Sequence, residues 1–356
     1  MDPDAPMYTD VSDVGEFGLI AHLRDALGPD LPDDVVTGIG DDAAVIRQSD
    51  GSVHVHTTDA LIEGIHFDRT FMPMEHLGFK LISVNVSDLA AMNVSPQYAT
   101  VTLGIPKNIT VEHLRTLYEG IQKGCDAYGV TVVGGDTTSA QALTLSMNVW
   151  GTAEEDAVVH RSGAEPGDVL CVTGDLGASY AGLKILADER NRLEEEGEDF
   201  QPALDAFPYV IRRHLAPPAQ EASIRRWRNA GFRPSALIDI SDGLSSEVHH
   251  ICEASDVGAR IFAPTLPLHP ETRNVADHFG DDVDVYAFFG GEDYELLFTA
   301  DESDLDALDG TTYTIIGEVT DAEKGVLVEQ GGGTAIPMRP GGFDHFGEDE
   351  NSDAAE

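Results

Sequence analysis

Lysine is scarce in this sequence, which has five lysines among 21 basic residues, against 64 acidic residues and a formal net charge of −43. A chain this acidic repels nucleic-acid phosphates, so binding through phosphate neutralisation is excluded. Disorder could carry the same charge, but 42% of the residues are hydrophobic and recur at helix and strand periods. Molar salt shortens the Debye length to about 3 Å and screens self-repulsion on such a surface. We therefore expect a folded, halophilic protein.

Cysteines and long apolar runs are also rare. Cys125, Cys171 and Cys252 are far apart and lie in apolar segments, so we expect buried thiols rather than a disulfide framework or a CxxC metal site. No apolar run approaches the roughly 20 residues that cross a bilayer. The acidic start "MDPDAPMYTDVSD" lacks the pattern of a signal peptide. We expect a cytoplasmic protein with no membrane partner.

The usual phosphate-binding and hydrolytic motifs are missing. The sequence contains neither GxxxxGK[ST] nor GxSxG. The segment "GDLGASYAG" (174–182) lacks GxGxxG spacing, and we interpret it mainly as a helix N-terminus, which could also face an anion. His54, His56 and His66 hint at zinc, but a solvent-facing side of a strand explains the first two and oxygen ligands outnumber them.

Carboxylates in glycine-flanked, apolar settings are what the sequence has instead. They occur in six segments: "GIGDDAAVI", "TTDALIEGIHF", "NVSDLAAM", "VVGGDTTSA", "LIDISDGLS" and "FFGGEDYELLF". Each one alone has a structural explanation, such as an Asx turn at residues 41–42 or an N-cap at Ser241 or Asp242. Unpaired charges in such settings are costly, and Mg²⁺ prefers oxygen ligands together with substrate phosphates. Together the six segments indicate a magnesium–phosphate site.

The apolar spacing predicts two α+β domains with mixed β-sheets flanked by helices. Predicted helices include 14–27, 75–93, 178–190 and one over 110–129 with Thr110 as N-cap and Gly129 as C-cap. A predicted strand ends at Thr57, Thr58 and Asp59, and Asp136 follows another. A boundary falls within 154–168 and an exposed acidic insertion within 188–205. The predicted parts are a disordered start (1–14), an N-terminal domain (15–153), a C-terminal domain (154–346) and a disordered tail (347–356).

The ordered motif set resembles the thiamine-monophosphate kinase family, within the superfamily of aminoimidazole ribonucleotide synthetases. The resemblance runs from about Gly15 to Phe346 and also includes "GEFGLI", "RSGAEPGD" and the late "GGFDHF". It implies PurM-like N- and C-terminal domains and a homodimer formed through the N-terminal sheets. It also implies Mg²⁺-dependent transfer of the ATP γ-phosphoryl to thiamine monophosphate, giving thiamine diphosphate and ADP.

The resemblance also implies roles for individual residues. Several Mg²⁺ ions would be held by Asp42, Thr57, Thr58, Asp59, Asp88, Asp136, Asp239 and Asp242. ATP would be contacted by Tyr118, Gly135, Asp136, Arg161 and Ser241, and thiamine monophosphate by His66, Glu292 and Phe343. No side-chain nucleophile is implied, because metal-assisted, in-line phosphoryl transfer depends on charge cancellation and positioning.

Two alternatives remain at this point. The chain could be another ATP-dependent phosphotransferase or ligase of the same superfamily, with a different small-molecule substrate. It could also be a non-catalytic nucleotide- or metal-binding module, although intact aspartates in every motif argue against that.

Overall fold

The computed structural model describes residues 9–28, 31–197, 201–309 and 312–342. The chain divides into two compact units, one of residues 1–33 with 343–356 and the other of residues 34–342. In the first unit, the 3-10 helix Val11–Asp13 precedes α1 (Gly15–Leu27), so the helix predicted over 14–27 is confirmed. Residues 1–8, which include most of the predicted disordered start, and the predicted tail 347–356 lie outside the described residues.

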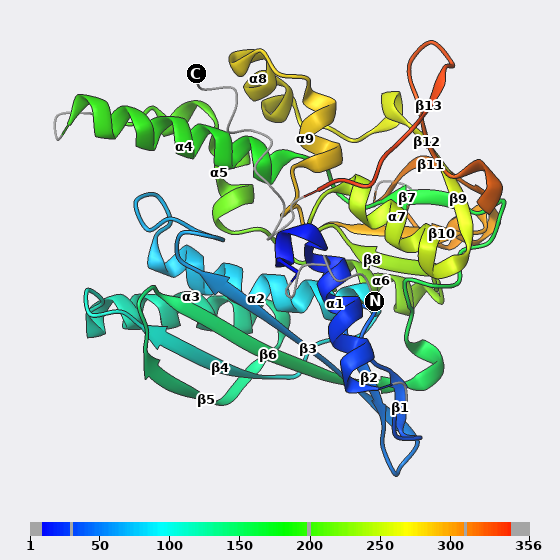
Figure 1. Cartoon of the computed structure of the whole chain (residues 1–356), viewed down its shortest axis with the longest axis horizontal. Helices are drawn as coiled ribbons and strands as arrows, with labels where there is room; N and C mark the ends of the chain where they lie inside the picture. Colours follow the sequence, from blue (N-terminus) through cyan, green and yellow to red (C-terminus); the bar gives the residue numbers. More distant parts are fainter. Residues whose placement is uncertain (1–8, 29–30, 198–200, 310–311, 343–356) are drawn as a thin grey trace, which may run out of the picture. The chain divides into compact units, whose positions relative to one another are not determined.

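The second unit begins with a six-stranded mixed sheet in the order β1-β2-β3-β6-β4-β5 (Figure 1). All its strand pairs are antiparallel except β4 with β5. The longest pairing joins β3 to β6 along their whole lengths. The strands are β1 (Val35–Thr37), β2 (Ala44–Arg47), β3 (Ser52–Ile62), β4 (Tyr98–Ile105), β5 (Thr131–Ser139) and β6 (Thr144–Glu154).

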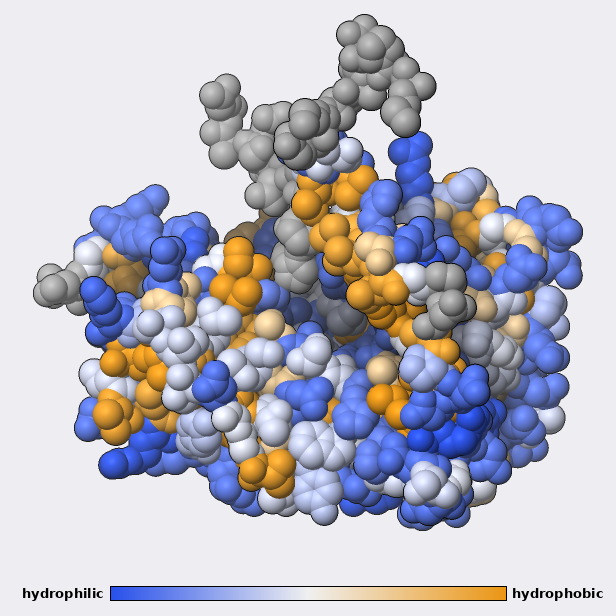
Figure 2. All heavy atoms as spheres, turned by 60° about the horizontal axis from the view of Figure 1, so that its bottom comes forward, coloured by the Kyte–Doolittle hydropathy of each residue, from blue (hydrophilic) through white to orange (hydrophobic). Residues whose placement is uncertain are grey.

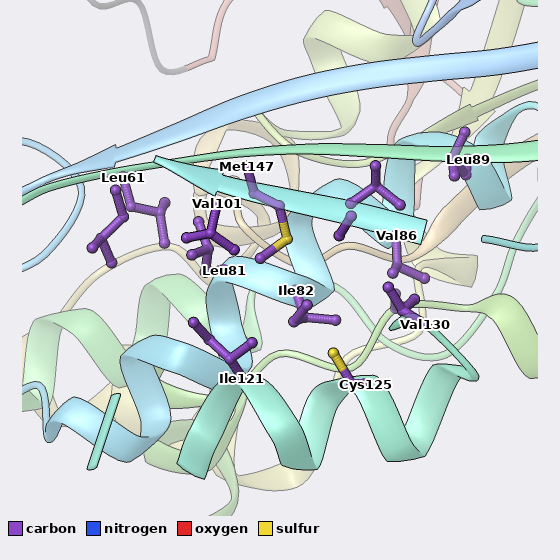
Figure 3. Close-up of a cluster of buried hydrophobic side chains, with 14 of the residues drawn as sticks. Leu61, Leu81, Ile82, Val86, Leu89, Val101, Ile121, Cys125, Val130 and Met147 are labelled. Carbon is purple, nitrogen blue, oxygen red and sulfur yellow. The ribbon is translucent and has the colours of Figure 1, made fainter. Parts of the chain in front are cut away.

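One face of this sheet is covered by α2 (Met74–Ala91), and α3 (Val111–Tyr128) packs against α2. The core between them is apolar, and Figure 3 shows Leu61 and Met147 of the sheet above Leu81, Ile82 and Ile121 of the helices. Helix α3 has the predicted ends, with Thr110 accepting a hydrogen bond from the backbone of His113 and Gly129 in the left-handed conformation. These caps satisfy groups that a helix end leaves unpaired.

Two glycines allow α2 and α3 to pack backbone to backbone. A Cβ added at Gly120 would lie 1.9 Å from the carbonyl oxygen of Glu75, and one added at Gly78 would lie 2.0 Å from that of Leu117. Any side chain at these positions would force the helices apart. This close packing fixes α2, which carries the predicted metal ligand Asp88.

The rest of the unit contains a seven-stranded sheet in the order β13-β12-β9-β11-β7-β10-β8, with β12 and β9 as its parallel pair. Its strands are β7 (Val169–Val172), β8 (Ala236–Asp239), β9 (Val257–Phe262), β10 (Leu296–Ala300), β11 (Thr314–Asp321), β12 (Val326–Glu329) and β13 (Ala335–Pro337). The helices are α4 (Ala178–Glu196), α5 (Pro208–Leu215), α6 (Glu221–Ala230), α7 (Leu244–Ser255), α8 (Pro270–Phe279) and α9 (Val283–Phe289). The predicted α+β architecture with mixed sheets is confirmed.

Several predicted boundaries were wrong. Strand β3 continues past Asp59 to Ile62, and β5 continues past Asp136 to Ser139, because each remains paired with a neighbouring strand. Helix α4 runs to Glu196 through half of the predicted acidic insertion. The acidic segment after β10 forms the 3-10 helix Glu302–Ala307.

The three cysteines are free and buried, as predicted. None of the helices in the described ranges combines the length and apolarity that a membrane span requires. On the face shown in Figure 2, hydrophilic side chains cover much of the surface and hydrophobic ones gather in separate patches.

Candidate functional site

Carboxylates from three separate elements form one group of interacting acids. Asp59 lies on β3, Asp88 on α2 and Asp239 at the end of β8. The hydroxyl of Thr57 donates to Oδ2 of Asp88 at 2.5 Å, and the hydroxyl of Ser87 donates to Oδ2 of Asp239 at 2.5 Å. We call Asp42, Asp59, Asp88 and Asp239 the acid cluster.

Asp42 joins this cluster together with Arg161. Nη2 of Arg161 lies 2.6 Å from Oδ1 of Asp42, and the Asp42 side chain is only 2% exposed. The neighbouring Asp41 is 2.9 Å from Nδ1 of His160. Oδ2 of Asp42 is buried and has no hydrogen-bond partner among the residues that the structure describes. Arg161 therefore binds one carboxylate oxygen of Asp42, and the other oxygen is left without a hydrogen bond from the described residues.

The acid cluster is electrostatically strained. Burial, followed by the charges of Asp59 and Asp239, raises the pKa of Asp88 well above its usual range. Burial, followed by the charge of Asp42, raises the pKa of Asp239 to about 8. Burial also raises the pKa of Asp42, although Arg161 opposes it. Each of these three carboxylates is thus destabilised in its charged form by its neighbours and by the loss of water.

This environment fits a divalent cation. Oδ2 of Asp42 makes no hydrogen bond to the described residues, and the carboxylates of the acid cluster repel one another. A bound cation would stabilise the charged form of these carboxylates. Within the described ranges, however, no group of three or more His, Cys, Asp or Glu side chains is arranged so as to hold a metal ion. Mg²⁺ is commonly held by only one or two carboxylates together with waters and substrate phosphates, so both observations agree with an ion that enters with its phosphate ligand.

The turn after β8 is held by a buried glutamate. Oε1 of Glu247 accepts hydrogen bonds from the backbone of Ser241 at 3.2 Å and of Asp242 at 2.8 Å. Burial, followed by the charge of Asp242, raises the pKa of Glu247 well above its usual range. The N-cap of α7 is Gly243, which makes no side-chain cap, so Ser241 and Asp242 do not cap the helix. The turn that carries them directly follows Asp239 of the acid cluster and Ile240.

The "GGEDYELLF" segment adds a second ionic group. Glu292 has φ 56°, in the left-handed region, and its amide donates to the carbonyl of Ser241 at 2.6 Å. Nζ of Lys80 lies 2.6 Å from Oε1 of Glu292, and Nδ1 of His214 lies 3.4 Å from Oε2. Burial alone would raise the pKa of Glu292, but Lys80 and His214 together outweigh it and leave the pKa lowered. His66 also contributes to this lowering.

Some predicted site residues lie apart from the acid cluster. Thr58 points to the opposite side of β3 from Thr57, because side chains alternate along a strand, and its hydroxyl donates to the carbonyl of Met147 at 3.0 Å. Gly135 lies in the same cross-strand row as Asp59, three strands away. That separation is about 14 Å at the usual strand spacing. Asp136 is exposed beside Gly135 on the edge strand β5, Tyr118 is 41% exposed on α3, and Phe343 lies outside the described residues.

Three further residues at the site were not among the predicted site residues. Lys80, Glu247 and Tyr294 are buried near the predicted site residues. Lys80 carried a weak signal, a charged residue between apolar neighbours of α2, whereas Glu247 lies in the largely polar helix α7 and carried none. Tyr294 has φ 51°, and burial, followed by the charges of Glu292 and Asp59, raises its pKa well above the usual range.

Two models of known domain families match this chain. The model "AIR synthase related protein, N-terminal domain" matches residues 40–153, and "AIR synthase related protein, C-terminal domain" matches residues 165–330. The fold and the site therefore define an AIR synthase related protein of two PurM-like domains.

Individual relatives show which family within this class the chain resembles. The thiamine-monophosphate kinase of Aquifex aeolicus is 35% identical over 336 residues, covering 94% of this chain and 99% of its own. That of Escherichia coli K12 is 36% identical over 340 residues, covering 93% and 98%. A solved structure described as "AaThiL complexed with AMPPCP and TMP" is 33% identical, covers 96% of this chain and 100% of its own, and superposes with a TM-score of 0.81.

The chain belongs to the thiamine-monophosphate kinase family. The resemblance predicted from the sequence motifs is confirmed.

Proposed function

We propose that this chain is a thiamine-monophosphate kinase, which transfers the γ-phosphoryl group of ATP to thiamine monophosphate and releases thiamine diphosphate and ADP. The observation that carries the proposal is the convergence of Asp59, Asp88 and Asp239, from β3, α2 and β8, beside the Asp42–Arg161 pair. The metal ions that accompany a nucleoside triphosphate would supply the positive charge that these carboxylates lack.

The residues that would hold Mg²⁺ are the acid cluster with Thr57 and Asp242. When bound, Mg²⁺ offsets the charge of the triphosphate and of the transferring group. Arg161 keeps its own charge, because Asp42 and Asp41 outweigh the effect of burial and raise its pKa. Its Nε is buried and makes no hydrogen bond to the described residues, although it lies 3.8 Å from Oδ1 of Asp41, and the Arg161 side chain is 21% exposed. Arg161 can thus orient Asp42 and offer a further donor to a nucleotide phosphate.

The acceptor requires no catalytic base. A phosphate monoester has a second pKa near 6, so its oxygens already carry nearly two negative charges at neutral pH. The chain therefore has to position two anions in line and reduce their repulsion. Glu292, whose amide bonds to the Ser241–Asp242 turn, and His66 are our candidates for contacts with thiamine monophosphate, together with Phe343.

We also propose a homodimer formed through the face of the first sheet that α2 does not cover. Tyr98 and Val133 are 45% and 53% exposed, and the rings of Tyr98 and Trp150 lie 5.8 Å apart. Gly135 and Asp136 lie about three strand spacings from Asp59. A second copy could bring these residues and Tyr118 to the nucleotide. Use of ATP also fits a cytoplasmic location, and the charge balance fits a halophilic protein.

The test is the reaction itself, followed at molar KCl with ATP, Mg²⁺ and thiamine monophosphate. We expect thiamine diphosphate and ADP in equal amounts, no product after chelation of Mg²⁺, and slow turnover of free thiamine. Equal or faster turnover of free thiamine would place the chain in a different kinase class. ADP release without thiamine diphosphate would favour another acceptor within the superfamily.

A further inference from the structure

One of the five lysines of this chain is completely buried. Lys80 lies on α2 between Phe79 and Leu81 with a side-chain exposure of 0%, and its Nζ donates to Oε1 of Glu292 at 2.6 Å. Buried lysines are rare, because removing an ammonium group from water is costly unless it is paired. Lys80 is therefore buried at a position where its ammonium group pairs with the carboxylate of Glu292.

The other oxygen of Glu292 faces His214 on α5. Nδ1 of His214 is 3.4 Å from Oε2, and the His214 side chain is 2% exposed. Burial, followed by the charge of Lys80, lowers the pKa of His214 to about 4, so this ring is neutral near pH 7. Lys80 is thus the cation that balances Glu292, while His214 bounds the carboxylate on its other side.

The Glu292 side chain nevertheless keeps an open edge. It is 27% exposed, whereas the two side chains that hold it are buried. Its backbone is fixed as well, since the amides of Glu292 and Tyr294 donate to the carbonyls of Ser241 and Ile240 at 2.6 and 2.8 Å. Both residues adopt left-handed backbone conformations, which residues other than glycine seldom occupy. Strained, over-determined segments of this kind are typical of binding sites.

We propose that Lys80 is a positioning residue for the acceptor substrate, which fixes the Glu292 carboxylate so that its open edge meets the cationic, amine-bearing ring system of thiamine monophosphate. The proposal rests on the proposed function, in which Glu292 contacts this substrate. The carboxylate oxygen that accepts from Lys80 keeps a lone pair for a further donor, and so does the oxygen that faces His214. Without Lys80, the carboxylate would turn toward water or bind a proton, and either change would weaken acceptor binding.

The proposal predicts an effect confined to the acceptor. In Lys80→Met, a side chain of similar length lacks the charge, and we expect the KM for thiamine monophosphate to rise roughly tenfold or more, as for a broken buried charge pair. The KM for ATP should change less than about twofold. The matched control is Lys123→Met. Nζ of Lys123 also lies 2.6 Å from a glutamate oxygen, Oε1 of Glu75, but both side chains are exposed. Lys123→Met should leave both KM values unchanged.

A double-mutant cycle separates positioning from general stability. If Lys80 acts through Glu292, adding Lys80→Met to a protein that already carries Glu292→Gln should change the KM for thiamine monophosphate less than about twofold. The double variant should also melt at a higher temperature than Glu292→Gln alone, which leaves the Lys80 charge buried and unpaired. An undiminished effect of Lys80→Met in the Glu292→Gln background would overturn the proposal, as would parallel losses for ATP and thiamine monophosphate.

A second variant covers the case in which Lys80→Met does not fold. Lys80→Arg keeps the charge but displaces the carboxylate, so it should also raise the KM for thiamine monophosphate and spare the KM for ATP. An unchanged acceptor KM in a folded Lys80→Arg protein would then overturn the proposal. Wild-type protein that forms no thiamine diphosphate would overturn the proposed function and this inference together, whereas active wild type with normal Lys80 variants would overturn this inference alone.

Discussion

Replacing Asp88 with asparagine removes one negative charge from the acid cluster and leaves the shape of the side chain almost unchanged. In the metal-free protein, Asp88 is destabilised by burial and then by the charges of Asp59 and Asp239. The amide oxygen of asparagine can still accept the hydrogen bond from Thr57. The substitution therefore relieves repulsion without removing a contact.

The two opposing terms set the expected change in stability. A neutral acceptor in place of a charged one weakens the Thr57 hydrogen bond by about 1 kcal/mol. An uncompensated buried charge costs a protein about 3–5 kcal/mol, and part of this cost is already relieved where the carboxylate binds a proton. We expect the metal-free Asp88→Asn protein to be as stable as wild type or more stable by up to about 2 kcal/mol. That corresponds to a rise of a few degrees in melting temperature for a chain of this size.

Turnover should respond in the opposite direction. If Asp88 helps to hold Mg²⁺, its loss removes charge stabilisation that is present during transfer, and kcat should fall on the order of 100-fold or more. The assay combines thermal melts, with and without Mg·ATP, with turnover at saturating Mg²⁺. The stabilisation of the wild-type protein by Mg·ATP should be reduced in the variant. Asp126→Asn makes the same change on the exposed side of α3 and serves as the control.

Two results would refute this reasoning. A stable Asp88→Asn protein with near-normal turnover and a normal Mg²⁺ dependence would remove Asp88 from the metal site. Clear destabilisation with full activity in the folded fraction would instead assign it a structural role.

Three further predictions concern stability. Gly120→Ala should destabilise the protein by about 3 kcal/mol in urea melts, because its Cβ would lie 1.9 Å from the carbonyl oxygen of Glu75; a loss below about 1 kcal/mol would mean that α2 and α3 can separate freely. The folded pKa of His214 is lowered to about 4 from 6.5, so as the pH falls from about 7 to 4.5 the unfolded chain binds a proton that the folded chain rejects. Wild type should therefore lose roughly 2–3 kcal/mol more over that range than His214→Gln; equal losses in urea melts at the two pH values would contradict this. From the net charge of −43, the melting temperature should rise as KCl goes from dilute to molar, and a flat or falling melting temperature would oppose the halophilic interpretation.

The sequence by itself was sufficient for features that depend on local spacing. The caps of α3 at Thr110 and Gly129 and the apolar helix α2 follow from short-range periodicity and capping chemistry, and both are present. The ordered motifs were also sufficient for the family, because each motif is contiguous and keeps its place along the chain. The prediction of two mixed sheets was also confirmed, because the sequence showed strands separated by hairpin turns in some places and by helices in others.

Only the tertiary structure decided which of these residues meet. Whether β3 ends at Asp59 depends on β6, which continues to pair with it to Ile62. That Thr57 rather than Thr58 meets Asp88 depends on which face of β3 the helix α2 covers. Lys80 looked like one more residue of an apolar helix, since its partner Glu292 lies 212 positions further along the chain. The burial of a side chain and the charge that it pairs with depend on contacts between residues far apart in the sequence. The periodic pattern within one segment therefore cannot predict them.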